Sequence, residues 1–529
     1  MLFLSQLFMK YIATIIIFLL FPLFIYAQRG DLDEETQPIG LEYFNIKEIP
    51  LSGHSDTFKL IDLNNNGIKE IVYIQIETFS LEILSYDKSI SEYRLQQTIK
   101  IPSGVMIISI GNYLQTNGKE IAFYTSDTIF CYKNNGGKTY NEEKIPLASE
   151  PSIFYPPAQT NADLSGNTIN AIPLIKEGED INNDGIDDLI IPTKNGYLIS
   201  WGPYEKAGLS KKQIINQPAS QSIKTTDSSF ITISASLPNI FLKDLDGDGL
   251  KDIILGFSDK LLYYFQNKEK GLFPENPSGE FRLDFLASPN NKSGSNILLY
   301  SNQFADLNAD GFTDLIIAST SGDLSDIGNM VTRLFVFPGN RSGNSIYSTP
   351  PSQVINLKGV CPLWGVTEIN GDNYPDLFIT SFKVSMASNI KKAILRYIPI
   401  TYQVYLNKPG KCFPVSPDYE RNVNFPSSAL GKGTGYFSHI YFGYDYNNDN
   451  RTDLLTISGP EKKKGLVTIY CGRQKNRLTR PDGVSFEKDE FLLCPVRIPD
   501  KAVVTDLNND KKNDIILQYK SKLTILIAK

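Results

Sequence analysis

The chain has 529 residues, 41% hydrophobic and 21% charged, a globular composition that excludes a disordered or fibrous protein. Its formal charge of −6 argues against a nucleic-acid-binding protein, because such proteins carry basic faces. The only histidines are His54 and His439, so neither a histidine-rich zinc site nor a catalytic histidine cluster is expected. Frequent Gly, Pro, Tyr and Phe favour many short strands joined by turns.

The N-terminus predicts export. Residues 12–26 are predominantly apolar, and Ala27 places a small residue before a cleavage site. We therefore expect a signal peptide over residues 1–27 and a mature chain over 28–529, which is secreted, periplasmic or at the cell surface. The alternative is an uncleaved anchor, but this apolar core is short for the ~20 residues that span a bilayer. No later segment is apolar enough to cross a membrane.

An acidic turn recurs along the mature chain. Its clearest copy is residues 244–253, where four aspartates surround a glycine-containing turn. Alignment on this turn gives eight repeats, whose turns start at Asp62, Asn112, Asp180, Asp244, Asp306, Glu368, Asp445 and Asp506. These repeats are about sixty residues long, and a regular repeat of this kind indicates a radial or stacked assembly. They fill the mature chain and leave no room for a separate domain.

The fourth repeat shows the plan of one unit. Apolar runs at Ile240–Leu242, Ile253–Phe257 and Leu261–Phe265 predict three strands, and Phe281–Phe285 alternates as a half-exposed outer strand does. Four antiparallel strands per unit, repeated radially, predict an all-β protein with a single β-propeller. The inner strands are apolar because both of their faces pack against neighbouring blades.

The two ends of the chain predict how the propeller closes. The last repeat lacks a fourth strand, and an otherwise unassigned strand at Tyr43–Leu51 can complete it and remove an open sheet edge. We therefore expect eight four-stranded blades. The alternative is seven blades, which requires the degenerate second repeat not to be a blade, although Glu120–Tyr124 and Thr128–Tyr132 still predict strands there.

The acidic turns predict calcium sites. A calcium loop takes oxygen ligands from alternating residues, and close carboxylates repel each other without a cation. The turns place such residues at positions 1, 3, 5 and 9. The predicted ligands are Asp62, Asn64, Asn66, Glu70, Asp180, Asn182, Asp184, Asp188, Asp244, Asp246, Asp248, Asp252, Asp306, Asn308, Asp310, Asp314, Glu368, Asn370, Asp372, Asp376, Asp445, Asn447, Asp449, Asp453, Asp506, Asn508, Asp510 and Asp514.

Position 6 of each turn is expected to have a positive φ, which Gly and Asn tolerate best. It is a Gly or an Asn in six turns: Gly67, Gly185, Gly249, Gly311, Asn373 and Asn450. The eighth turn departs from the pattern with Lys511. The second turn has Asn112, Leu114 and Thr116 at ligand positions, so no metal is expected there.

Flexible oxygen ligands favour Ca²⁺ over Mg²⁺, with about seven sites, the tightest in the fourth turn and the weakest in the first. An EF-hand is excluded because its twelfth position must be a Glu, and here Ile191 and Leu255 fall there inside apolar strands. The remaining alternative is a series of turns that hold no ion, since Asp, Asn and Gly favour turns anyway. The repetition of one four-ligand spacing favours metal sites.

At these turns the chain resembles the FG-GAP/VCBS repeat family, which forms the blades of the integrin α-subunit head. The resemblance covers essentially the whole mature chain. It implies a propeller with calcium held between the first and second strands of each blade. It also implies that ligands meet the opposite face, formed by the loops between strands two and three and between blades. Integrin heads have seven blades, one fewer than the eight expected here.

Insertions on that opposite face are the expected place for function, because long loops on a rigid scaffold carry binding residues. They are residues 149–172, 319–332 and 381–400. Aromatic residues at 154–155 and Trp364 fit either ligand stacking or packing between blades, and packing is favoured. The sequence thus favours a protein- or glycan-binding adhesion module over an enzyme. A polysaccharide lyase on the same scaffold is the alternative, and a structural part of an envelope complex is a third.

Short motifs add little. Cys471 and Cys494 flank a predicted turn, so a disulfide between them is one interpretation; five buried thiols is the other. Arg29-Gly30-Asp31 matches an integrin-binding signal, but a three-residue match at a terminus is most simply explained by chance.

Overall fold

The computed structural model describes residues that all belong to one compact unit, Gly40–Lys529. The described residues are 44–51, 58–136, 139–149, 173–204, 211–226, 230–269, 271–286, 297–322, 330–340, 346–370, 372–382, 397–408, 410, 412–426, 440–444, 453–458, 465–470, 472–474, 484–486, 492–496, 499, 501–519 and 521–529. The expected signal peptide, the Arg29-Gly30-Asp31 motif and both histidines lie outside them.

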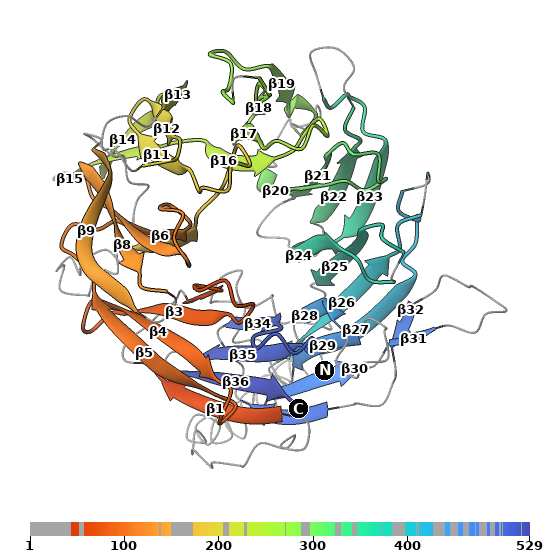
Figure 1. Cartoon of the computed structure of the whole chain (residues 1–529). Coiled ribbons are helices and arrows are strands. Elements are labelled where there is room, and N and C mark those ends of the chain that lie inside the picture. The colour runs from red at the N-terminus through yellow and green to blue at the C-terminus, as the bar shows by residue number, and fades with distance from the viewer. Residues whose placement is uncertain are drawn as a thin grey trace, which may run out of the picture. The chain divides into compact units, whose positions relative to one another are not determined.

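The strands form sheets that follow one another around a ring, as expected for a β-propeller (Figure 1). The first repeat forms β2 (Phe58–Ile61), β3 (Glu70–Gln75), β4 (Ser80–Asp87) and β5 (Glu92–Lys100). The second forms β6 (Ile107–Gly111), β7 (Glu120–Tyr124), β8 (Thr128–Asn134) and β9 (Tyr140–Ser149). The third contains β10 (Leu174–Glu177), β11 (Leu189–Thr193), β12 (Gly196–Ser200) and β13 (Lys212–Asn216).

The middle repeats follow the same plan. The fourth forms β16 (Asn239–Lys243), β17 (Asp252–Gly256), β18 (Lys260–Tyr264) and β19 (Gly279–Arg282), followed by the 3₁₀ helix η1 (Asp284–Leu286). The fifth forms β20 (Ile297–Ala305), β21 (Asp314–Ser321), β22 (Val331–Phe337) and β23 (Gln353–Lys358). The sixth forms β24 (Val360–Thr367), β25 (Asp376–Phe382), β26 (Tyr397–Tyr405) and β27 (Tyr419–Pro426).

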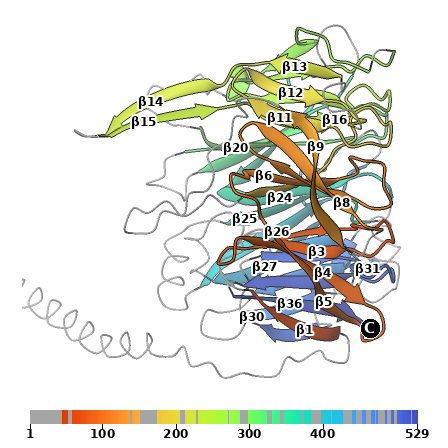
Figure 2. The same cartoon turned by 60° about the vertical axis from the view of Figure 1, so that its left-hand side comes forward.

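The last two repeats complete the ring. The seventh forms β28 (Ile440–Tyr444), β29 (Asp453–Ser458), β30 (Gly465–Tyr470) and β33 (Leu492–Val496). The eighth forms β34 (Lys501–Thr505), β35 (Asp514–Tyr519) and β36 (Lys522–Ala528). Two separate two-stranded sheets are β14 (Ser220–Thr226) with β15 (Phe230–Ser236), and β31 (Gly472–Gln474) with β32 (Val484–Phe486). Figure 2 shows the β14–β15 hairpin projecting from the third repeat.

The N-terminal strand closes the propeller as predicted. Strand β1 (Phe44–Pro50) pairs antiparallel with β36 along its whole length, from Phe44 opposite Ala528 to Pro50 opposite Lys522. Lys522 also forms an ion pair with Glu48 across the same two strands. The last sheet therefore has the order β1–β36–β35–β34, in which β1 covers the edge of β36 that would otherwise be open.

The expectation of eight four-stranded blades is wrong; seven sheets of four or five strands form the blades, the number given as the alternative. The repeat that does not form a four-stranded sheet of its own is the third, not the second. The second repeat forms a blade, and its sheet gains a fifth strand from the third repeat, in the order β10–β6–β7–β8–β9. Strand β10 pairs in parallel with β6, from Leu174 opposite Ile107 to Glu177 opposite Ile110. This leaves β11, β12 and β13 as a three-stranded sheet, linked to the end of β10 by the single bridge Glu179–Asp188.

The core lies between neighbouring sheets. In one buried cluster, Ile199 and Trp201 of the third repeat pack with Leu255 and Leu262 of the fourth. Equivalent clusters join the first repeat to the second, the second to the third, the fourth to the fifth, the fifth to the sixth, the seventh to the eighth and the eighth to the first. Between the sixth and seventh repeats, strand β27 contacts strand β29. Each fully buried aliphatic side chain contributes about 1.5–3 kcal/mol to folding.

Candidate metal sites

The acidic turns that the structure describes in full each join the first strand of their repeat to the second. The residue at position 9 begins or immediately precedes the second strand, where the apolar faces of adjacent sheets meet. All of these carboxylates are buried in the described repeats that carry the motif: Glu70, Asp188, Asp252, Asp314, Asp376, Asp453 and Asp514. The repeated motif therefore places one buried acidic side chain at the same end of successive sheets.

The fourth turn shows how the carboxylates are held. Asp252 accepts hydrogen bonds from the backbone N–H of Leu245 at 2.9 Å and of Gln266 at 2.8 Å. Asp244 accepts from the backbone N–H of Gly247 at 2.8 Å and of Gly249 at 2.9 Å. Backbone donors therefore fix the carboxylates at positions 1 and 9 of this turn.

The same frame recurs in the other motif turns that are described. The position 9 carboxylate accepts from the backbone N–H of the second residue of the turn in the pairs Leu63–Glu70, Ile181–Asp188, Leu307–Asp314, Ile369–Asp376 and Leu507–Asp514. In four of these turns its other oxygen accepts from a backbone N–H at or just after the end of the third strand, in the pairs Gly202–Asp188, Gly339–Asp314, Asn407–Asp376 and Ala528–Asp514.

Burial opposes ionisation of the position 9 carboxylates. Desolvation raises the pKa of Asp252 to about 7, although the backbone donors Gln266 and Leu245 act in the other direction. The same cause raises the pKa to about 7 for Glu70, Asp188, Asp376 and Asp514, and to about 6 for Asp314. A divalent cation beside these groups would favour the charged form and lower these pKa values.

The fourth turn has the dimensions of a calcium site. Carboxylate oxygens of Asp244, Asp246 and Asp252 all lie within 4.8 Å of one another. Calcium binds oxygens at about 2.3–2.6 Å, so two ligands of one ion lie at most about 5 Å apart. Within the described part of the chain, this is the only group of three or more acidic, histidine or cysteine side chains gathered so closely. The donor set and its spacing therefore fit a hard cation.

Four turns with Asn at position 3 and Asp at position 5 are arranged differently. In the fifth turn, Asn308 Nδ2 donates to Asp310 Oδ2 at 2.8 Å, while Asn308 Oδ1 accepts from the backbone N–H of Asp310 at 3.0 Å. The same reciprocal pair occurs at Asn182–Asp184, Asn370–Asp372 and Asn508–Asp510. An ion in these turns must compete with the amide for the position 5 carboxylate.

The turn geometry agrees with the backbone prediction for position 6. Gly67, Gly185, Gly249, Gly311 and Asn373 all have a positive φ. Lys511 also has a φ of 70°, and its backbone N–H donates to Asp506 Oδ2 at 2.8 Å. The eighth turn therefore keeps the shared shape with a residue that this conformation disfavours.

Part of the seventh turn lies outside the described residues. Asp445, Asn447, Asp449 and Asn450 belong to that part, and only the buried Asp453 is described.

The second turn, where no metal is predicted, is held by protein donors. Its fully buried Glu120 accepts from the backbone N–H of Tyr113 at 2.8 Å and of Leu114 at 3.0 Å, and from the Thr116 hydroxyl. In addition, Asp187 of the third repeat accepts from the backbone N–H of Asn112 at 2.6 Å.

Asp187 was not singled out from the sequence, because it lies at position 8, outside the ligand pattern. Gly111 and Gly178 leave room for its side chain between β6 and the end of β10. A Cβ added at Gly178 would lie 2.5 Å from Asp187 Oδ2, and one at Gly111 would lie closer still. These two glycines are the sequence feature that accompanies the placement of the Asp187 side chain. They lie 67 residues apart in the chain, and neither belongs to the repeat motif.

The sequence also drew attention to aromatic residues, cysteines and three insertions, and the structure describes only some of them. Trp364 is buried and its Nε1 donates to Ser301 Oγ at 2.8 Å, which confirms the packing interpretation. Cys131 and Cys361 are buried free thiols, and Cys412 is a half-buried one. Cys494 lies on β33, but Cys471 is outside the described residues, so the Cys471–Cys494 disulfide stays one interpretation. Residues 154–155 and most of the three insertions also lie outside the described residues.

Comparisons with known proteins give only remote likenesses. No family model matches the chain, and no curated protein does. One similar solved structure is a lectin of Agrocybe aegerita with specific recognition of non-reducing terminal N-acetylglucosamine (14% identity, 92% of this chain and 95% of that chain, TM-score 0.39). Others are BBS1N in complex with ARL6DN (10%, 92% and 97%, 0.34) and Saccharomyces cerevisiae Sqt1 (8%, 90% and 99%, 0.35). With TM-scores this low, the likenesses carry no argument about function.

Proposed function

We propose that this chain is an exported, calcium-stabilised β-propeller of the FG-GAP/VCBS type that acts as a binding module for a protein or a glycan. The observation that carries the proposal is the recurrence of one acidic turn at the same place in successive sheets. The cluster of Asp244, Asp246 and Asp252 oxygens, with the spacing that one calcium ion requires, supports it most directly.

A metal-free role accounts less well for the turns. Turns without an ion need only one Asp or Asn to accept from the backbone. Here each motif turn also carries a carboxylate buried among apolar strands, where an unneutralised charge is unfavourable. Calcium removes this penalty and joins the first and second strands of each blade.

The scaffold suits binding better than catalysis. A closed ring of packed sheets holds its connecting turns rigidly, and such turns are the usual place for recognition. The buried carboxylates accept hydrogen bonds from backbone donors within the turns, which supports a structural role for them. Nothing in the described residues forms a helix with the length and hydropathy of a membrane span.

Two measurements test the proposal. Metal analysis of the dialysed protein should find several calcium ions per chain, and Mg²⁺ should replace them poorly because it demands stricter geometry. Glycan-array and pull-down screens with and without calcium should then find a ligand whose binding is lost with the metal. A chain that binds no calcium contradicts the proposal. Release of unsaturated sugars from acidic polysaccharides would identify a lyase instead.

A further inference from the structure

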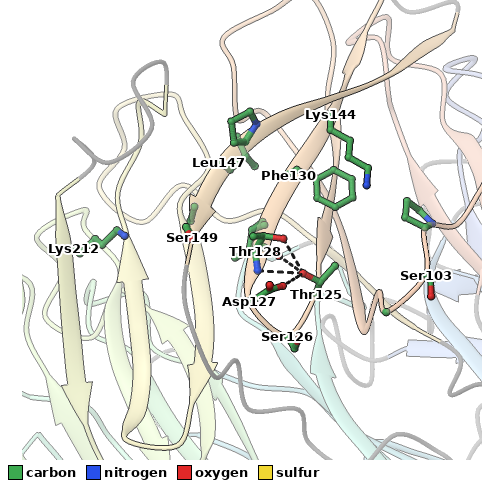
Figure 3. Close-up of a pocket in the computed structure, with 15 residues that line it drawn as sticks. Ser103, Thr125, Ser126, Asp127, Thr128, Phe130, Lys144, Leu147, Ser149 and Lys212 are labelled. Carbon is green, nitrogen blue, oxygen red and sulfur yellow. Dashed lines mark hydrogen bonds between the residues drawn. The ribbon is translucent and has the colours of Figure 1, made fainter.

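A groove with a volume of about 720 Å³ lies over the second repeat (Figure 3). Its size falls within the roughly 300–1,000 Å³ of small-molecule sites. The lining comes from the β5–β6 connection, the β7–β8 turn, strand β9 and Lys212 at the start of β13. In Figure 3, Ser103 and Lys144 lie on one side and Lys212 on the other. The groove thus extends from the second repeat towards the third.

The main part of the groove is at the end of the sheet remote from the acidic turn. The acidic turn joins the end of β6 to the start of β7, whereas the β7–β8 turn follows the far end of β7. Residues 102–104 precede β6 and therefore lie at that same far end. A ligand in this part of the groove leaves the acidic turn untouched.

Strand irregularities shape the groove. Strand β9 shifts register against β8 twice, once between the pairs Ile129–Ala148 and Phe130–Pro146, and once between Cys131–Ile145 and Lys133–Asn141. Lys144 belongs to the second bulged segment, and its Nζ lies 4.7 Å from the centre of the Phe130 ring. Bulges redirect side chains and are common beside binding sites. Here they place an ammonium group against an aromatic wall.

The β7–β8 turn is a rigid polar wall. Thr125 Oγ1 donates to Asp127 Oδ1 at 3.0 Å and accepts from the backbone N–H of Thr128 at 3.1 Å. The Thr125 backbone N–H also donates to Thr128 O at 2.9 Å. The first of these bonds orients the Asp127 carboxylate, which lines the groove. A carboxylate oxygen can accept more than one hydrogen bond, so Asp127 can also receive a ligand hydroxyl.

The chemistry of the lining is mixed in a way that fits a sugar. Apolar side chains of Pro146, Leu147 and Phe130 stand beside the hydroxyls of Ser103, Ser126 and Ser149. Sugars offer an apolar C–H face to such walls and hydroxyls to such polar groups. The charged side chains of the lining are Lys144, Lys212 and Asp127, so groups of both signs are available to a ligand.

We propose that this groove binds an anionic oligosaccharide, with Lys144 and Lys212 recognising its acidic groups and Asp127 accepting from its hydroxyls. The proposal rests on the proposed function and names the ligand class for it. Carboxylated and sulfated sugars share the required chemistry, and the experiment distinguishes them.

The test is calorimetric titration of the calcium-loaded protein with three tetrasaccharides: tetragalacturonate, a sulfated tetramer and neutral maltotetraose. At least one anionic sugar should bind about tenfold more tightly than maltotetraose. Lys144→Gln and Lys212→Gln, which remove the charge and leave a polar side chain one atom shorter, should each weaken that binding by about tenfold. Lys133→Gln is the matched control, because Lys133 is an exposed lysine on β8 that does not line the groove.

Several outcomes overturn the proposal. Binding of all three sugars with equal affinity removes the role of charge, and unchanged affinity in both groove variants removes the groove as the site. Lysine-dependent binding of poly-glutamate without binding of any sugar assigns the groove to an acidic protein. If a glycan or protein binds in a calcium-dependent way but ignores both lysines, the proposed function survives and only the groove assignment fails.

Discussion

The turns of the second and fourth repeats occupy equivalent places but are held differently. In the fourth, Asp244, Asp246 and Asp252 bring their oxygens within 4.8 Å of one another. In the second, Thr116 and two backbone N–H groups satisfy Glu120, and Asp187 arrives from the next repeat to bind Asn112. One turn gathers three carboxylates with the spacing of a cation site, and the other matches its single carboxylate with protein donors. If the proposed calcium sites exist, the two turns should differ in how far their stability depends on calcium.

The largest expected effect is that of removing calcium altogether. A site filled at about 100 times its Kd stabilises the folded state by about 2.7 kcal/mol, so loss of several ions should lower the melting temperature substantially. Thermal unfolding in excess calcium and in chelator measures this. Refilling with calcium should restore the melt and magnesium should not. A melt that chelator leaves unchanged would falsify calcium stabilisation of the fold.

The second effect isolates one turn of each kind. Asp252→Asn should lose the calcium contribution of the fourth turn, about 2.7 kcal/mol, and so should cost much less in chelator than in calcium. Glu120→Gln is the matched variant in the second turn. It should cost about 1.5–3 kcal/mol through its buried hydrogen bonds, by the same amount with and without calcium. Equal calcium dependence of the two variants would contradict the distinction between the turns.

A third variant tests how the second turn manages without a metal. Asp187→Ala leaves the Asn112 N–H without its acceptor and opens a gap beside Gly111 and Gly178. The expected loss is about 1–3 kcal/mol in the free energy of unfolding, independent of calcium. Denaturant titration in both conditions measures it. A loss that appears only in calcium would show that Asp187 acts on the neighbouring third turn instead.

Much of the fold was predictable because its signals are local. The apolar runs of the fourth repeat became β16, β17 and β18, and the strand expected at Tyr43–Leu51 became β1 in its predicted pairing. The outer strand was placed less well: β19 ends at Arg282, and η1 follows it. Alternation predicts an exposed strand, but it does not say where a 3₁₀ turn interrupts it.

The third repeat shows where local signals end. The sequence places β10 just before the third acidic turn, where the first strand of a separate blade is expected, yet β10 pairs with β6. Asp187, Gly111 and Gly178 lie together near the end of β10, and they meet only in the folded chain. In the same way, the groove beside Phe130 and Lys144 arises from two register shifts that the sequence does not mark. Among the described residues, the predicted insertions reach this groove only at Ser149, and the rest of its lining comes from strands and short connections.

The smallest expected effect concerns the eighth turn, which resembles the fourth in shape but has Lys511 at φ 70°. Lys511→Gly should relieve left-handed strain of about 1–2 kcal/mol, less the extra chain entropy of glycine, about 0.5–1 kcal/mol. The difference is a net gain of roughly 0–1.5 kcal/mol. Removing a positive charge from this turn should also tighten calcium binding. Lys512→Gly is the control: Lys512 has no positive φ, so glycine there should destabilise. Chemical denaturation of both variants in calcium decides the matter, and equal shifts would show that backbone strain does not distinguish the eighth turn from the fourth.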